Sequence, residues 1–245
     1  MPDAVANRPN DSGNPGEMGR QAKDFGPRDA NPRVDVATPD ASRNPARPEC
    51  GDESLTQWEQ KMLEAHNRWR GSVQPTAAKM YRVYWDTNIA RNAAEWVSSC
   101  DPAWPHSPDE NRRNIGGYDV LGENLSFCAG SGCAPDPNIT DESGKGDGEG
   151  WWNERNDYQW SDDTSTGITA HYTLMVSSNV YAIGCATQRC DPPGPSNWDG
   201  EWWWTICQYG PRGQAYWVGT KPYDAGEGGL IEPPDTVFDE HCLHR

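Results

Sequence analysis

Basic side chains are scarce in this chain of 245 residues, which carries 21 lysines and arginines against 37 aspartates and glutamates. The resulting net charge of −16 repels phosphate backbones and anionic lipid headgroups, so we expect no nucleic-acid partner. The chain also lacks an apolar run long enough to span a bilayer, so we expect no transmembrane segment. Cations and basic proteins suit this composition better.

Aromatic side chains are nearly absent from residues 1–49, where Phe25 is the only one. This segment holds eight prolines and four glycines, and its seven basic and eight acidic residues follow no period. Such a composition buries too little apolar surface to offset the entropy lost on folding, roughly 1–2 kcal/mol per ordered residue. We therefore predict a disordered arm over residues 1–49 and a folded domain over residues 50–245.

All eight cysteines follow the arm, and no two of them form the C-x2-C pair that is typical of zinc ribbons. An even number of cysteines in a domain rich in glycine and tryptophan favours four disulfides and an oxidising compartment, so we expect a secreted protein. Reduced buried thiols are the weaker alternative. Sequons occur at Asn10, Asn124 and Asn138, and we expect Asn138, in an acidic loop, to be the glycosylation site.

Hydrophobic periodicity predicts two helices in the first half of the domain. The first begins with a capping box over residues 54–57, where Ser54 is the N-cap residue, and it ends at Gly71 in the left-handed cap position. The second begins at Asp86 as its N-cap residue and ends at Cys100, because the Asp-Pro dipeptide that follows prevents continuation.

The second half of the domain contains three further patterns. Residues 151–158 place aromatic and acidic side chains at the spacing of a short helix. Residues 167–179 indicate a helical turn that leads into a strand, because the period changes to two over residues 180–186. We predict another strand over residues 201–209, and a loop-like tail from about residue 218.

Five ionisable side chains lie in unusual surroundings. His66 falls on the apolar side of the first helix, where a hydrogen-bonded core histidine is more common than a ligand. Two prolines bracket His106, although a lone loop histidine is usually a solvated residue. Glu123 lies between small and apolar residues, Glu154 shares a predicted helix face with aromatic rings, and His171 lies in the turn before a strand.

Four motifs, in order along the chain, resemble the CAP superfamily, which includes cysteine-rich secretory proteins, insect venom antigen 5 and plant pathogenesis-related class 1 proteins, with the SCP/TAPS domain in common. They are H-N-x-x-R at residues 66–70, G-E-N-L at 122–125, H-Y-T-L-M-V at 171–176 with G-C-A at 184–186, and C-Q-Y-G-P-R-G at 207–213. The resemblance implies an α+β fold, an α-β-α sandwich with a small central antiparallel sheet that disulfides stabilise.

The same resemblance implies a surface cleft that holds two histidines and two glutamates. The family's loop histidine matches His106, its G-E-N acid matches Glu123, its W-x-x-E acid matches Glu154 and its H-Y-T histidine matches His171. Because the two histidines are the usual metal contacts in the family, we expect His106 and His171 to bind zinc or another divalent cation, which need not be obligatory. The two glutamates would bind water or orient the imidazole rings.

The resemblance also implies two of the four disulfides, Cys100 with Cys190 and Cys185 with Cys207. The leftover cysteines then pair as Cys128 with Cys133 and Cys50 with Cys242. Eight cysteines allow many pairings, so these four are a specific prediction.

Four roles are compatible with such a cleft. The first is binding of a lipid or sterol without turnover, because several family members carry sterols or fatty acids; the 13 tryptophans would line a groove, although core packing explains them equally well. The second is binding of an extracellular protein by the acidic face. The third is a metal-dependent hydrolase or protease that uses Glu123 and Glu154, although neither H-E-x-x-H nor G-x-S-x-G occurs. The fourth is a buried polar network that only fixes the cleft.

Overall fold

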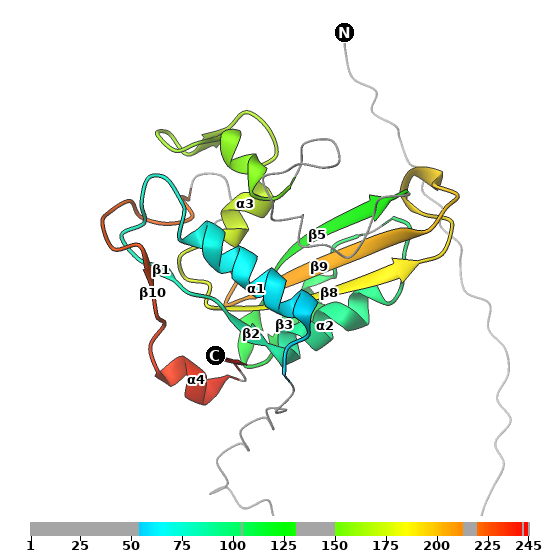
Figure 1. Cartoon of the computed structure of the whole chain (residues 1–245), viewed down its shortest axis with the longest axis horizontal. Coiled ribbons are helices and arrows are strands. Elements are labelled where there is room, and N and C mark those ends of the chain that lie inside the picture. The colour runs from blue at the N-terminus through cyan, green and yellow to red at the C-terminus, as the bar shows by residue number, and fades with distance from the viewer. Residues whose placement is uncertain (1–53, 104, 131–149, 213–219, 242, 245) are drawn as a thin grey trace, which may run out of the picture. The chain divides into compact units, whose positions relative to one another are not determined.

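The computed structural model describes residues 54–103, 105–130, 150–212, 220–241 and 243–244. The predicted arm over residues 1–49 and the predicted glycosylation site Asn138 lie outside these residues. Within them, a five-stranded sheet forms the centre of the domain (Figure 1). Its strands, in spatial order, are β11 (Leu243–His244), β2 (Tyr84–Asp86), β8 (Ala182–Cys190), β9 (Trp202–Gly210) and β5 (Gly122–Ala129).

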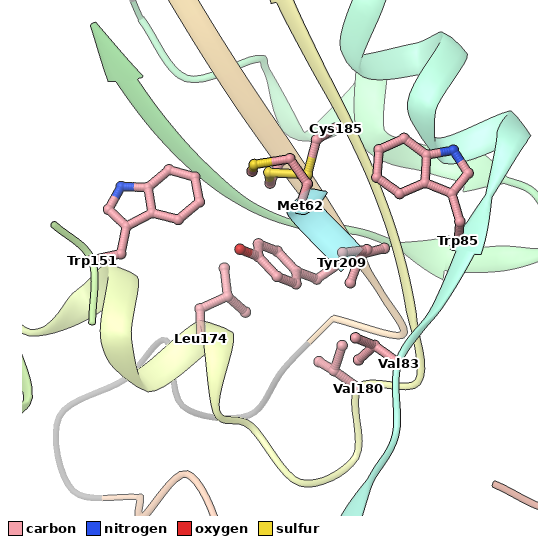
Figure 2. Close-up of a cluster of buried hydrophobic side chains, with 10 residues drawn as sticks. Met62, Val83, Trp85, Trp151, Leu174, Val180, Cys185 and Tyr209 are labelled. Carbon is pink, nitrogen blue, oxygen red and sulfur yellow. A yellow bond between two sulfur atoms is a disulfide. The ribbon is translucent and has the colours of Figure 1, made fainter. Parts of the chain in front are cut away.

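Helices cover both faces of this sheet. On one face, α1 (Gln57–Arg70) and α3 (Ala170–Met175) share a buried cluster with Tyr209 (Figure 2). On the other face, α2 (Thr87–Val97) packs against Trp204. These two aromatic residues are an odd number of positions apart on β9, so they point to opposite faces. The fold is therefore the predicted α-β-α sandwich, with every neighbouring strand pair antiparallel except β2 with β8.

Shorter elements surround the sandwich. They are β1 (Met80–Tyr81) with β10 (Leu230–Ile231), β3 (Arg113–Ile115) with β4 (Tyr118–Val120), β6 (Tyr158–Gln159) with β7 (Thr164–Ser165), the 3-10 turns η1 (Asp109–Arg112), η3 (Asn153–Asn156) and η4 (Pro195–Asn197), and α4 (Thr236–Glu240). The helix predicted over residues 151–158 is thus reduced to the turn η3. In the part of the chain that the structure describes, no helix has the length and apolarity to cross a membrane.

The helix boundaries differ from the prediction at three places. Thr56, and not Ser54, caps α1: its hydroxyl accepts a bond from the Glu59 N–H at 3.3 Å, and the Glu59 carboxylate accepts from the Thr56 N–H at 2.7 Å. Gly71 has a φ of −75°, so it does not take the left-handed cap conformation. Asp86 caps α2 as predicted, but α2 ends earlier than expected.

The C-terminal tail is more ordered than the loop-like segment that we predicted. Its strand β11 pairs antiparallel with β2 and forms an edge of the central sheet. His241 packs flat on the ring of Tyr118, with centroids 4.2 Å apart, and its Nδ1 lies 2.7 Å from the carbonyl oxygen of Gly116. The apolar side chain of Leu243 packs against the buried cluster around Ile89. These contacts explain why a segment without a clear period adopts secondary structure.

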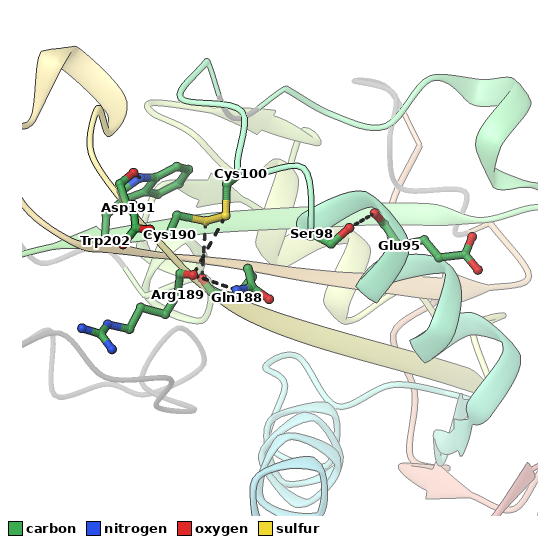
Figure 3. Close-up of a disulfide and its surroundings, with 8 residues drawn as sticks. All are labelled: Glu95, Ser98, Cys100, Gln188, Arg189, Cys190, Asp191 and Trp202. Carbon is green, nitrogen blue, oxygen red and sulfur yellow. Dashed lines mark hydrogen bonds between the residues drawn. A yellow bond between two sulfur atoms is a disulfide. The ribbon is translucent and has the colours of Figure 1, made fainter.

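Two of the predicted disulfides are confirmed. Cys185 and Cys207 lie directly opposite each other on β8 and β9, with Cα atoms 4.0 Å apart. Cys100 and Cys190 join the loop after α2 to the end of β8, with Cα atoms 5.5 Å apart, beside the indole of Trp202 (Figure 3). The other two predicted pairs involve residues outside the described ranges, Cys128 with Cys133 and Cys50 with Cys242.

The guanidinium of Arg70, at the end of α1, is a buried charge, because the residue is only 1% exposed. Such a group is costly to bury unless its N–H groups find hydrogen-bond acceptors. It donates five hydrogen bonds, at 2.6 to 2.9 Å, to four backbone carbonyl oxygens, those of Tyr81, Met175, Ser177 and Val180. Burial lowers its pKa from 12.5 to about 9, so the side chain remains charged at neutral pH. One cation therefore ties α1 to the strand before β2, to the end of α3 and to the start of β8.

Replacing this guanidinium by an ammonium should destabilise the fold strongly. In Arg70→Lys, three donors on a single nitrogen replace a planar fork of five, so buried carbonyl oxygens lose their partners. We expect the free energy of unfolding, measured by urea denaturation, to fall by about 3 kcal/mol or more. Arg68→Lys is the matched control, because Arg68 is exposed on the same helix, and it should change stability by less than about 0.5 kcal/mol. Equal losses in both variants would contradict the role of Arg70.

Candidate functional site

The first predicted histidine pairs with the first predicted glutamate. His106 lies in the loop that precedes η1, and Glu123 is the second residue of the edge strand β5. The Nδ1 atom of His106 lies 2.9 Å from Oε1 of Glu123. The histidine side chain is 46% exposed, whereas the glutamate side chain is fully buried, so the imidazole covers the carboxylate from the solvent side.

Glu123 is surrounded by hydrogen-bond donors. Besides His106, its oxygens accept bonds from the Ser107 N–H at 2.9 Å, the Ser107 hydroxyl at 2.5 Å and the Gln208 amide at 2.9 Å. Burial raises the pKa of this carboxyl, but these hydrogen bonds and the nearby charge of Arg112 outweigh burial, so the pKa lies below its ordinary value. Glu123 is therefore a buried carboxylate that stays ionised and has its acceptor positions filled.

The second predicted histidine pairs with the second predicted glutamate. His171 belongs to the first turn of α3, and Glu154 to the 3-10 turn η3. The Nδ1 atom of His171 lies 2.5 Å from Oε1 of Glu154, whose Oε2 accepts a bond from the Tyr172 N–H at 3.0 Å. The indole of Trp151 stacks on the imidazole, with ring centroids 5.7 Å apart and planes 7° apart. This pair is 26% exposed at the histidine and 13% at the glutamate.

Strand β5 connects the two pairs. Asn124 follows Glu123 directly, and its amide donates to the carbonyl oxygen of His171 at 2.9 Å and to the hydroxyl of Tyr209 at 3.2 Å. The same hydroxyl lies 2.9 Å from Nε2 of His66. Adjacent strand residues point to opposite faces, so one His–Glu pair lies on the α2 side of β5 and the other is linked to its α3 side. Both pairs therefore adjoin β5, which is an edge strand of the described sheet.

His66 is a core histidine, as its position in the first helix predicts. It is completely buried, and its Nδ1 lies 2.8 Å from the carbonyl oxygen of Met62. Burial lowers its pKa from 6.5 to about 4, so the ring is neutral at physiological pH, donates to Met62 and accepts from Tyr209. His66 therefore stabilises the core beneath the site and is not exposed to a ligand.

The arrangement fixes the proton positions of both surface histidines. An ionised carboxylate accepts hydrogen bonds and cannot donate them, so each Nδ1 that faces a glutamate carries the proton. When such a ring is neutral, its lone pair is on Nε2, the form in which histidine binds zinc, and the glutamate is the outer partner that orients the ring. Among the described residues, no group of three or more histidines, cysteines, aspartates or glutamates is placed to hold a metal ion together.

Three residues that our sequence reasoning did not assign help to build the site. Ser107 and Gln208 hold the carboxylate of Glu123, and Asn124 links the two pairs. Each is adjacent in sequence to a residue that was singled out, but nothing in the sequence shows that their side chains converge. Asn124 also begins one of the three sequons. It is 2% exposed and its amide donates two hydrogen bonds inside the protein, so in this fold it has a structural role.

Comparison with known proteins gives a consistent picture. A model of the cysteine-rich secretory protein family, CAP, matches residues 63–209. GLIPR1-like protein 1 of Homo sapiens is 29% identical over 165 residues, which cover 67% of this chain and 62% of that protein. Peptidase inhibitor 15 of Homo sapiens is 29% identical over 186 residues, which cover 71% of this chain and 64% of that protein. The chain thus spans less than two thirds of the length of these relatives.

Solved structures share the fold. The crystal structure of NaASP2 with Zn2+ superposes with a TM-score of 0.53 at 27% identity, covering 73% of this chain and 91% of that one. Venom allergen-like protein 4 of Schistosoma mansoni has a TM-score of 0.53 at 20% identity, covering 71% of this chain and 98% of that one. The second likeness supports the fold alone.

Removing the charge of Glu123 should destabilise the domain. In Glu123→Gln, one acceptor oxygen becomes an NH2 group that faces a donor, and we expect the free energy of unfolding at pH 7 to fall by about 2–4 kcal/mol. Glu64→Gln, at an exposed position of α1, is the charge-matched control and should be nearly neutral. Equal stability of the wild type and Glu123→Gln would overturn this reading.

The same variant should alter the pH dependence of stability. The folded-state pKa of Glu123 lies below its ordinary value of 4.5, so this group stabilises the fold above that pH, and its contribution is lost as the pH falls through the folded-state pKa. The stability difference between wild type and Glu123→Gln, followed by urea denaturation at decreasing pH, should therefore shrink in acid. A difference that grows below pH 4.5 would contradict the lowered pKa.

Proposed function

The chain belongs to the cysteine-rich secretory protein family, and on that premise we propose that it is an extracellular binding protein whose two His–Glu pairs respond to divalent metal ions. It is a CAP protein of the type represented by GLIPR1-like protein 1 and peptidase inhibitor 15. The two described disulfides support an extracellular location, because such bonds persist in oxidising compartments. Membership of the cysteine-rich secretory protein family supports the same location.

The observation that carries the metal proposal is the orientation of the two imidazoles. His106 and His171 each direct Nδ1 at a glutamate, which leaves Nε2 as the metal-binding atom. Two nitrogen ligands are fewer than the three or four protein ligands of catalytic and structural zinc sites, so the metal would keep water ligands and exchange readily. The crystal structure of NaASP2 with Zn2+, at 27% identity, supports zinc as the ion to test.

The same geometry favours binding over hydrolysis. A general base must accept a proton from water, and its pKa should lie near the working pH. Glu123 has a lowered pKa, is 2% exposed and accepts four hydrogen bonds, so it is poorly suited to that task. Glu154 is more exposed but holds His171 and the Tyr172 N–H. Metal-dependent hydrolysis therefore remains the alternative function, with Glu154 as its better candidate base.

An aromatic pocket supports the binding of a lipid. It has a volume of about 250 Å³ and lies between the segment after α1 and the region from η3 to α3. Four aromatic side chains line it, those of Trp152, Tyr158, Trp160 and Tyr172, together with Arg155, Ser72 and Gln74. Pockets that enclose drug-sized ligands measure about 300–1,000 Å³, so this one suits part of a fatty acid better than a whole sterol. The guanidinium would face the carboxylate.

An extracellular protein is the other class of partner. Some relatives, such as peptidase inhibitor 15 and peptidase inhibitor R3HDML, are named peptidase inhibitors, but the chain covers only part of their length, so a protein target is carried over as a proposal. The net charge of −16 favours a basic partner over an acidic one.

Zinc affinity tests the metal proposal. We expect saturable zinc binding by calorimetry, with His106→Asn and His171→Asn each weakening it at least about tenfold and Glu154→Gln weakening it about 10–100-fold. His244→Asn is the control, because β11 and β5 are opposite edges of the sheet. Zinc binding that survives both site substitutions together would overturn the proposal. Zinc-dependent cleavage of a peptide library that Glu154→Gln abolishes would instead establish the hydrolase.

Fatty-acid binding tests the aromatic pocket. We expect a labelled fatty acid to bind saturably and without turnover, and Arg155→Gln to weaken it about five- to tenfold while leaving the affinity for the matching fatty alcohol unchanged. Arg68→Gln removes a charge outside the pocket lining and serves as the control. Equal competition by a sterol would show that the pocket opens beyond the volume described, and absence of saturable binding would refute the lipid role.

A further inference from the structure

A second pocket, of about 300 Å³, lies on the opposite side of the sheet from the aromatic pocket. It is lined by Asn92, Glu95 and Trp96 of α2 and by Ser107 and Asn111 from the segment around η1. It shares Ser107 with the surroundings of Glu123, but it includes neither histidine of the two pairs. No function considered so far uses it.

The polar groups of this pocket include a carboxylate and amide oxygens that can accept hydrogen bonds. The amide nitrogen of Asn92 donates to Gln208 at 2.7 Å, and its amide oxygen is an acceptor that a ligand could use. Glu95 contributes a carboxylate from an exposed position. The indole N–H of Trp96 donates to the carbonyl oxygen of Pro105 at 3.0 Å, so this residue offers its ring and not a donor. An anionic ligand would be repelled by the carboxylate of Glu95.

The basic side chains nearby are engaged elsewhere. Arg91, four residues before Glu95 on α2, has its guanidinium 3.3 Å from the side-chain oxygen of Asn88. The guanidinium of Arg112 donates to the carbonyl oxygens of Ser107 and Leu121 and to the carboxylate of Asp109. Within the described ranges, the carboxylate of Glu95 has no salt-bridge partner, so no basic side chain of these ranges neutralises its charge.

Two residues that line the pocket, Asn92 and Ser107, are held in place by hydrogen bonds within the protein. Asn92 bonds to Gln208, Gln208 bonds to Glu123 at 2.9 Å, and Glu123 accepts from the hydroxyl of Ser107. Two lining residues are thus the ends of one hydrogen-bonded chain that runs through the most buried carboxylate of the site. A pocket whose polar groups are already oriented loses less entropy on binding than one whose side chains must order.

We propose that this pocket binds an organic cation, an ammonium or guanidinium group carried on a short aliphatic chain. The Glu95 carboxylate and the Asn92 oxygen would accept its hydrogen bonds, and the Trp96 ring would contact the charge or the chain. The volume is at the lower end of the range for ligand pockets, which suits one lysine or arginine side chain or a free small amine. The acidity of the whole chain would raise the local concentration of such cations.

Indole N–H resonances of protein labelled with ¹⁵N-tryptophan, with Trp96 assigned by Trp96→Phe, provide the test. The probes are N-acetyl-arginine amide, N-acetyl-lysine amide and n-butylammonium, with neutral N-acetyl-citrulline amide as the isostere. A chelator is present throughout, so the result does not depend on the metal proposal. We expect the three cations to shift Trp96 saturably, citrulline to fail, and Glu95→Gln to weaken binding roughly fivefold.

Two comparisons complete the test. Glu64→Gln removes the same charge from an exposed position of α1 and should leave the cation affinity unchanged. Tighter binding of the capped amino acids than of butylammonium would identify a peptide side chain as the source of the cation. Tighter binding of butylammonium would identify a free amine, and either result supports the proposal. Equal binding of arginine and citrulline, equal affinity in the two glutamate variants, or no saturable shift of Trp96 would overturn it.

Discussion

The buried guanidinium of Arg70 is the interaction on which the rest of the structure depends. A charge in a core is costly unless every donor finds an acceptor, and here all five N–H groups bond to backbone carbonyl oxygens of segments far apart in sequence. Two of these acceptors lie at and just after the end of the helix that carries His171. The position of that histidine is therefore set partly by a cation in the core and not by local sequence.

The two His–Glu pairs differ in how much they contribute to the fold and how much they offer to a ligand. Glu123 is saturated with hydrogen bonds inside the protein, so its first role is to hold the loop of His106 against β5. Glu154 has fewer internal partners and remains partly exposed. One carboxylate thus mainly stabilises the loop of His106, and the other remains partly accessible to solvent.

The resemblance to the CAP superfamily predicted the sandwich and both described disulfides, because four motifs occur in the family's order along the chain. The sequence did not show which histidine faces which glutamate, since that depends on how η3 and α3 pack. It also assigned the first cap to Ser54, because both Ser54 with Gln57 and Thr56 with Glu59 have the spacing of a capping box, and the second pair forms it. The tail was called loop-like because its order comes from long-range contacts of Leu243 and His241.

Strand β5 also constrains how related chains can vary in length. Glu123 and Asn124 serve opposite faces of the sheet, so shifting their alternation by a single residue would turn the carboxylate toward α3 and the amide toward the loop of His106. Insertions in the connections outside the strand leave this phase intact. Within β5 itself, a gain or loss of one residue would have to be absorbed by a bulge to keep both side chains on their present faces.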